Sequence, residues 1–206
     1  AKSLIDFEFG SGMFLPSVSG YEMRTDNAFA VNINLTEDFT VAVFRDDAYM
    51  YGTKSYTPDA AVLPNVNKCT IVNEGNISLN GIRLMHTVPM LTFLTAGLEI
   101  GTARIITTRQ NYRRDGTSGA FAGDWGNPQQ INGSFPLMGV LLRAVYKPEI
   151  EKLNTAVFAS LSYRLIDVTE TFALGSRTAQ KTTPEEIDPI KNFNNITFLI
   201  GFQIGF

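Results

Sequence analysis

Large apolar side chains occupy every second position of the C-terminal stretch, residues 195–206. They alternate with small or polar side chains, with Leu199 as the exception. A strict period of two predicts a β-strand with two chemically different faces. A soluble domain rarely exposes such a strand, because a bare apolar edge invites aggregation. The pattern therefore favours a strand with one face toward lipid and the other toward a lumen.

The same alternation recurs along the whole chain and predicts eight strands. We expect them at residues 3–14, 28–35, 39–45, 76–85, 91–106, 137–146, 155–167 and 195–206. The fourth segment changes phase between Leu79 and Ile82. A one-residue bulge at Gly81 would restore the facing of its side chains, since glycine tolerates a bulge.

The connections between these segments alternate in length. Short ones are expected at 36–38, 86–90 and 147–154, and long ones at 15–27, 46–75, 107–136 and 168–194. Transmembrane barrels have short periplasmic turns and long extracellular loops. The sequence therefore predicts one all-β domain over residues 1–206, an eight-stranded antiparallel up-and-down transmembrane β-barrel. A soluble lipocalin-like barrel, with the same apolar side chains turned inward, is the alternative.

Composition narrows the choice further. Charged residues make up 18% of the chain, below the roughly 25% of ordinary soluble domains. No stretch approaches the ~18 consecutive apolar residues of a transmembrane helix. The net charge of −3 argues against a nucleic-acid partner. Cys69 is the single cysteine, so no intrachain disulfide is expected, and the sequence assigns it no role.

The whole pattern, closed by Phe206 at the last position, resembles the small outer-membrane barrels of the OmpA, OmpX and OmpW kind. The resemblance implies that Phe198, Phe202 and Phe206 form the signal recognised by the barrel-assembly machinery. It also implies a monomer in a bacterial outer membrane, with periplasmic termini, extracellular loops and a signal peptide absent from this sequence. Members of this group serve anchoring, adhesion, host contact or passage of small molecules, so the fold does not choose among these roles.

Several charged side chains have the parity that points into the lumen. The three acids are Asp6, Glu8 and Glu99, and the three arginines are Arg83, Arg143 and Arg164. In an eight-stranded barrel, side chains nearly fill the interior. These groups could brace the lumen as ion pairs, or they could form a gate along a narrow polar path. Their balance argues against strong ion selectivity, which needs a ring of one sign.

Candidate catalytic and metal-binding residues are scarce. His86 is the only histidine, and we expect it in a short periplasmic turn, with no serine close in sequence. Lipid-modifying barrel enzymes mostly need a histidine near the outer face. The carboxylates Asp46, Asp47, Glu185 and Glu186 match no calcium loop and are expected to be solvated loop charges. We therefore expect no enzyme activity, no metal and no cofactor.

A basic cluster follows the fifth predicted strand. Arg109, Arg113 and Arg114 lie just beyond it, and Arg104 has its lipid-facing parity. Arginine suits bidentate contact with phosphate, so lipopolysaccharide is a candidate partner, with ordinary loop charge as the alternative. The predicted function is a structural or interaction barrel in contact with outer-membrane lipid and an unidentified surface or envelope protein. The alternatives are a narrow channel for small or apolar solutes and, second, a lipid-modifying enzyme.

Overall fold

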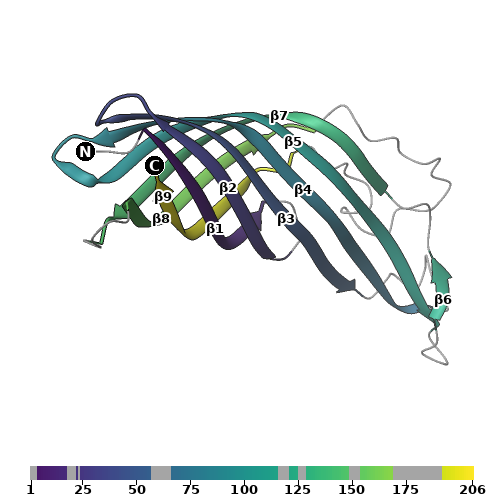
Figure 1. Cartoon of the computed structure of the whole chain (residues 1–206). Coiled ribbons are helices and arrows are strands. Elements are labelled where there is room, and N and C mark those ends of the chain that lie inside the picture. The colour runs from purple at the N-terminus through teal and green to yellow at the C-terminus, as the bar shows by residue number, and fades with distance from the viewer. Residues whose placement is uncertain are drawn as a thin grey trace.

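The computed structural model describes residues 4–17, 22, 24–56, 66–115, 121–124, 129–148, 154–168 and 192–206. No helix among these residues is long and apolar enough to cross a membrane. The strands follow in the order β1 Ile5–Pro16, β2 Arg24–Asn34, β3 Phe39–Tyr56, β4 Val66–Val88, β5 Leu91–Asp115, β6 Phe121–Asp124, β7 Gln129–Tyr146, β8 Asn154–Ile166 and β9 Asn195–Gly205 (Figure 1).

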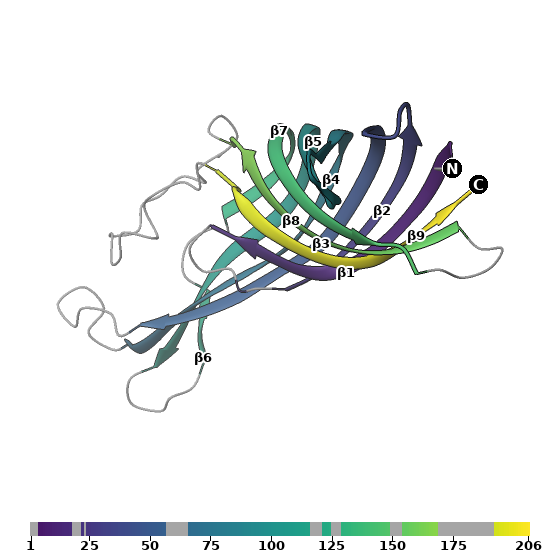
Figure 2. The ribbon, with the colours of Figure 1, turned by 90° about the vertical axis from the view of Figure 1, so that its left-hand side faces the viewer.

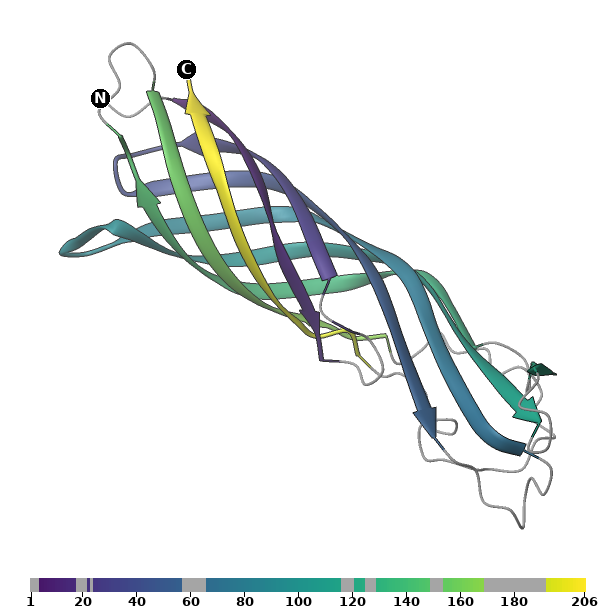
Figure 3. The same cartoon turned by 90° about the horizontal axis from the view of Figure 1, so that it is seen from below.

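Within the described part of the chain, eight strands close into one antiparallel ring. Each strand pairs with its neighbour in chain order, β5 with β7, and β1 closes the ring against β9 (Figure 2). The short β6 stands outside the ring and pairs with the end of β5. β1 begins and β9 ends at the same end of the barrel (Figure 3), where the Phe206 N–H donates to the Ile5 carbonyl at 3.0 Å. We call this the terminal end and the opposite one the far end.

The strands are strongly staggered around the ring. A row of paired residues that begins at Asp6 runs through all eight strands and returns to β1 at Pro16, ten residues further along. This stagger requires strands tilted against the barrel axis, typically by about 35–45°. The tilt places residues of one paired row at successive depths in the barrel. Side chains distant in sequence therefore meet in the lumen.

Large apolar side chains cover the outside of the ring. Phe7, Phe29, Leu98, Leu161 and Phe202 are all exposed, and Val41, half-buried, has the same outward parity. A water-soluble monomer rarely exposes so large a continuous apolar surface. Here it forms a belt around a closed barrel, as in transmembrane barrels. The predicted eight-stranded up-and-down transmembrane barrel is confirmed, and the soluble alternative with inward-facing apolar residues is wrong.

Stacked phenylalanines cross the seam where the ring closes. The ring of Phe9 on β1 lies 5.4 Å from that of Phe202 on β9 and 5.2 Å from that of Phe29 on β2. Phe7 and Phe206 meet edge to face at 5.9 Å. Each such pair contributes about 0.5–1.5 kcal/mol beyond the area it buries. The seam between the first and last strands is therefore held by side chains as well as by the backbone ladder.

The short connections lie at the terminal end, as predicted. β4 and β5 are joined through Pro89 and Met90 alone, and Met90 has a φ of 67°. Proline presets the first position of such a turn, and the second requires a positive φ.

Strands on one side of the ring run far past the others. The predicted third and fifth strands end at residues 45 and 106, whereas β3 continues to Tyr56 and β5 to Asp115. The predicted fourth strand begins at residue 76, whereas β4 begins at Val66. Much of the predicted loops 46–75 and 107–136 is therefore strand, and that part of the loop prediction is wrong. Figure 3 shows β3, β4 and β5 continuing beyond β1, β2, β8 and β9. We call the part of β3, β4, β5 and β7 beyond the apolar belt the sheet extension.

The polarity of the two faces exchanges where the sheet extension begins. On β4, Ile82 and Leu84 point outward within the belt, whereas Asn80 and Asn76 point outward above it. The inward side chains change in the opposite sense, from Arg83 within the belt to Leu79 and Ile77 above it. On β7, outward Met138 and Val140 likewise give way to Ser134, Asn132 and Gln130.

This exchange explains the phase change that suggested a bulge at Gly81. Pairing of β4 with β3 and β5 is continuous through Gly81, and its irregularities lie only at Val66/Lys68 and Thr87/Val88. The predicted bulge is therefore wrong. The side chains keep their facing, and it is the surroundings that change from lipid outside to water outside.

A charged side chain placed on the outside should report this boundary. We expect Leu161→Arg, within the belt, to lower the free energy of unfolding by about 2–4 kcal/mol, since arginine is costly near the midplane of a bilayer. Asn80→Arg, outward on the sheet extension, should cost only about 0–1 kcal/mol. Urea titration of both variants in lipid vesicles measures the difference. Equal costs, or native protein that stays monodisperse without detergent, would contradict the assignment of the belt.

Candidate functional site

Two arginines and two carboxylates form the centre of the lumen. Arg83 Nε donates to Glu99 Oε1 at 2.7 Å, and Arg164 Nε donates to Glu99 Oε2 at 2.6 Å. Arg164 Nη2 also donates to Glu99 Oε1 at 3.2 Å, so this oxygen accepts from both guanidinium groups. Arg164 is completely buried, and buried ions of this kind persist only when paired.

The second carboxylate is that of Asp46, which was predicted to be a solvated loop charge. That prediction is wrong, because Asp46 on β3 is only 1% exposed. It accepts from Arg83 Nη2 at 3.2 and 3.3 Å and also from Arg164 Nη2. The error follows from the predicted strand end at residue 45. With β3 continuing, Asp46 has inward parity, and Asp47 points outward, where its carboxylate accepts from Arg45 at 2.7 Å.

A glycine makes room for this cluster. Gly139 on β7 pairs with both Glu99 and Arg164. A Cβ at position 139 would lie 3.0 Å from Arg164 Cγ and 3.1 Å from Glu99 Oε2, tighter than ordinary van der Waals contact. The missing side chain lets the two charged groups meet across β7.

A second group of polar contacts lies toward the terminal end. Arg143 on β7 donates from Nη1 to Glu8 at 2.5 Å and from Nη2 to Gln203 at 2.9 Å. Glu8 also approaches Arg83 Nη1 at 3.5 Å, which joins the two groups. Asp6 accepts from Asn34 at 2.6 Å and from Gln203. All six charged residues predicted for the lumen are therefore buried there and linked.

Aromatic rings support the arginines. The Arg83 guanidinium lies 4.2 Å from the centre of the Phe44 ring, and Arg143 lies 4.2 Å from that of Phe158. Such cation–π contacts are strongest when desolvated. Phe158 in turn lies against Gly10 and Gly201, where a Cβ would come within 3.2 and 2.5 Å of its ring. The rings fill the lumen between charged groups without adding further charge.

Above the charged cluster, toward the far end, the lumen is filled by a continuous apolar cluster, which we call the apolar plug. Its larger members are Phe14, Phe44, Met50, Ile77, Leu79, Ile105, Ile131, Phe135, Leu137, Ile166, Val168 and Phe193. They come from β1, β3, β4, β5, β7 and β8 and from the residues that follow β8 and precede β9. The lumen is thus closed by two layers of different chemistry, one ionic and one apolar.

Asp26 on β2 is the exception among the buried charges. It is 0% exposed, yet neither of its carboxylate oxygens has a hydrogen-bond partner. It pairs through its backbone with Gly12 and Ala48.

With Asp26 included, the described lumen holds five buried carboxylates, those of Asp6, Glu8, Asp26, Asp46 and Glu99, against three arginines. The balance of three acids and three arginines predicted from sequence is wrong, because Asp26 and Asp46 lay outside the predicted strands.

The remaining predicted residues lie away from this cluster. His86 is in strand β4 rather than in a turn; it is exposed, and its Nδ1 lies 2.7 Å from the Thr87 carbonyl.

Arg104 points outward as predicted and donates to Asn132 at 2.7 Å. Arg109, Arg113 and Arg114 belong to β5 rather than to a loop, and their side chains lie outside the described part of the structure, as does that of Cys69. Glu185 and Glu186 also lie outside it. Within the described residues, no group of three or more His, Cys, Asp or Glu side chains is placed to hold a metal ion.

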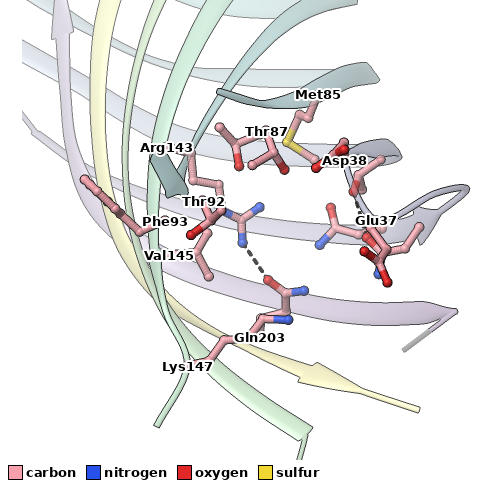
Figure 4. Close-up of a pocket in the computed structure, with 14 residues that line it drawn as sticks. Glu37, Asp38, Met85, Thr87, Thr92, Phe93, Arg143, Val145, Lys147 and Gln203 are labelled. Carbon is pink, nitrogen blue, oxygen red and sulfur yellow. Dashed lines mark hydrogen bonds between the residues drawn. The ribbon is translucent and has the colours of Figure 1, made fainter. Parts of the chain in front are cut away.

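A polar cavity of about 610 Å³ opens at the terminal end of the barrel. Arg143 and Gln203 lie on one side of it, joined by their hydrogen bond, as Figure 4 shows. Glu37 and Asp38 line the other side. No local sequence pattern predicts this cavity, because its residues come from strand ends and turns far apart in the chain.

Phe198, Phe202 and Phe206, predicted as the assembly signal, share the outward parity of β9.

Two aspartates with opposite surroundings allow a matched test of the lumen. Asp46→Asn leaves Arg83 and Arg164 short of a buried partner and should lower the free energy of unfolding by about 3–5 kcal/mol. Asp26→Asn removes a carboxylate without a hydrogen-bond partner and should leave that free energy unchanged or raise it by about 1–3 kcal/mol. Urea titration in detergent micelles provides both values. Similar losses in the two variants would show that the described pairing does not stabilise the barrel.

Comparison with known proteins agrees with this architecture. No protein-family model matches the chain, and no curated protein matches it in sequence. Among solved structures it is similar to Neisserial surface protein A (NspA), with 11% identity and a TM-score of 0.50, covering 100% of this chain and 99% of that one. It is similar also to Ail, the attachment invasion locus protein of Yersinia pestis, with 8% identity and a TM-score of 0.52, covering 100% of both chains.

At these identities the likeness concerns the fold alone. Both neighbours are small eight-stranded outer-membrane β-barrels, so the eight-stranded ring is the shared feature. The protein is therefore a small eight-stranded transmembrane β-barrel of the bacterial outer-membrane type, the class to which OmpA and OmpX belong.

Proposed function

We propose that this protein is a closed outer-membrane barrel that acts through binding at its surface rather than through transport or catalysis. The observation that carries the proposal is the double closure of the lumen. Arg83, Arg164, Asp46 and Glu99 form one layer, and the apolar plug forms the next. An ion would have to break buried pairs and then cross an apolar layer, and both steps are costly.

In this proposal the terminal end faces the periplasm and the far end faces the outside of the cell. The short connection at Pro89–Met90 lies at the terminal end, in keeping with the short periplasmic turns of such barrels. The sheet extension then stands outside the membrane. Its outward side chains are mostly polar, with Tyr49 and Ile106 as the exposed exceptions, and its inward ones are mostly apolar, which suits water on the outside and a packed interior.

The sheet extension is the surface that we propose for interaction. It is built of paired strands rather than loops, with β3 and β4 paired from Phe39↔His86 to Tyr56↔Cys69. A paired sheet holds its side chains in fixed positions, so a partner would meet a surface ordered before binding. The two structural neighbours are a surface protein and an attachment invasion locus protein, which is in keeping with a role in surface contact.

Lipopolysaccharide is a second proposed contact, at the base of the sheet extension. Outward Arg104 on β5 lies just above the belt residue Ile100, and outward Arg45 on β3 lies just above Val43. Lipid phosphates would lie at this height, and arginine binds them by paired hydrogen bonds. Arg104 already donates to Asn132, and Arg45 already donates to Asp47. To bind a phosphate, each arginine would release this partner or share its N–H groups between the partner and the phosphate.

A channel is the function that the lumen argues against most directly, and conductance tests it. In planar bilayers we expect no steady conductance from the wild type. Arg164→Ala should give only brief openings, because the apolar plug remains when the ionic layer is broken. Arg104→Ala is the matched control on the outer surface and should behave as the wild type. A stable, sizeable conductance from the wild type would instead establish the channel.

Lipid binding can be tested separately by thermal unfolding in detergent. Added lipopolysaccharide should raise the midpoint temperature of the wild type, because a ligand of the folded state stabilises it. Arg45→Gln with Arg104→Gln should lose most of that rise, and dephosphorylated lipopolysaccharide should give little. Lys147→Gln, which removes a cation at the terminal end, is the control. An equal rise in all of these proteins would exclude phosphate contact at the two arginines.

A further inference from the structure

The cavity at the terminal end is separate from the closed part of the lumen and takes no part in the proposed function. Its volume of about 610 Å³ falls within the range of about 300–1,000 Å³ typical of small-molecule sites. Its inner limit is formed by Arg143 and Gln203, whose other contacts belong to the charged cluster. It is therefore a blind pocket with a mouth at the terminal end.

Opposite charges line opposite sides of this pocket. Glu37 and Asp38 come from the turn between β2 and β3, and both are exposed. Lys147 follows β7 and is also exposed, while Arg143 lies deeper on β7. Figure 4 shows the two acids on one side and the two cationic residues on the other.

Neutral polar side chains also line the pocket; they are Asn32, Asn34, Thr40, Thr87, Thr92 and Thr95. Asn32 donates to Glu8, Asn34 to Asp6 and Thr40 to Asn34, so the hydroxyl groups of Thr87, Thr92 and Thr95 are the ones that a ligand would meet. Hydroxyl groups both donate and accept hydrogen bonds, and so match the N–H and C=O groups of a peptide. Val145 and Phe93 add a limited apolar surface.

We propose that the pocket binds a short peptide with a free amino terminus and a free carboxyl terminus. The ammonium group would lie against Glu37 and Asp38, and the carboxylate would lie against Lys147 and Arg143. Arg143 keeps one further N–H on each of Nη1 and Nη2 for this purpose, since its described bonds to Glu8 and Gln203 engage one N–H on each of these atoms, whereas its Nε is buried. Charge-assisted bonds at both termini would provide selectivity for zwitterions.

Other ligands fit the charge arrangement less well. A phosphate-bearing ligand would meet the carboxylates of Glu37 and Asp38 at the mouth and Glu8 behind Arg143. A simple cation would meet Lys147 and Arg143. A neutral sugar would use the hydroxyl groups but neither charged side, so its binding would not depend on either.

The full chain in detergent micelles allows a direct test by calorimetry, with trialanine as the probe. We expect trialanine to bind, and N-acetyl-trialanine and trialanine amide each to bind about tenfold more weakly or worse, since each loses a charge-assisted contact. The doubly blocked peptide should not bind measurably. Inorganic phosphate and glucose serve as the competing ligand classes.

Variants assign each terminus to its side of the pocket. Lys147→Gln should weaken trialanine binding but leave the affinity for trialanine amide unchanged. Glu37→Gln with Asp38→Asn should weaken trialanine binding but leave N-acetyl-trialanine unchanged. Glu74→Gln, an exposed acid on β4 away from the pocket, is the control and should change nothing.

No binding of trialanine by the wild type at millimolar concentration would overturn the proposal. So would equal affinity for the free and the doubly blocked peptide, or tighter binding of phosphate or glucose. All changed residues are exposed, and unchanged thermal unfolding would confirm that each variant is folded. Calorimetry of peptide binding does not depend on conductance. A negative binding result would therefore leave the proposal of a closed barrel standing, and a conducting wild type would leave the peptide site standing.

Discussion

The pairing of two buried arginines with two buried carboxylates is the interaction on which the lumen depends. Arg83 and Arg164 come from β4 and β8, and Glu99 and Asp46 from β5 and β3. Because an unpaired buried charge costs several kcal/mol, these four strands are stable in the one register that brings the groups together. Gly139 on β7 and the Phe44 ring complete the arrangement, the first by leaving room and the second by filling it.

The exchange of polarity along the longer strands follows from a second constraint, the thickness of the bilayer. A strand that crosses the membrane and continues into water keeps its alternation, but the face that must be apolar changes from the outer to the inner one. On β4 the change falls between Ile82 and Asn80 on the outside and between Arg83 and Leu79 on the inside. The apolar plug is the core of the sheet extension, and it also closes the barrel. One set of side chains thus serves both purposes.

Glycines have a particular place in this interior. Gly10 and Gly201 leave room for the Phe158 ring, and Gly139 leaves room for the contact of Glu99 with Arg164. The interior of an eight-stranded barrel is nearly filled by side chains, so a ring or guanidinium can lie across a neighbouring strand only where that strand has a glycine at the paired position. The same crowding separates the cavity at the terminal end from the plug, because Arg143 and Phe158 fill the space between them.

The sequence by itself determined the number of strands in the ring, their alternation and the six charged residues that its parity assigned to the lumen. Period-two patterns are local, so Asp6, Glu8 or Arg164 could be placed inward without knowing their partners. Only the tertiary structure decided where the strands end. Beyond the membrane the two faces of a strand exchange their polarity, so the outward face of β4 is no longer apolar there. For that reason Asp46 and Asp26 were not predicted to lie in the lumen, and a bulge was wrongly predicted at Gly81. The cavity at the terminal end is lined by Glu37, Lys147 and Gln203. These residues come together through the stagger of the strands and the closure of the ring, which no local sequence pattern predicts.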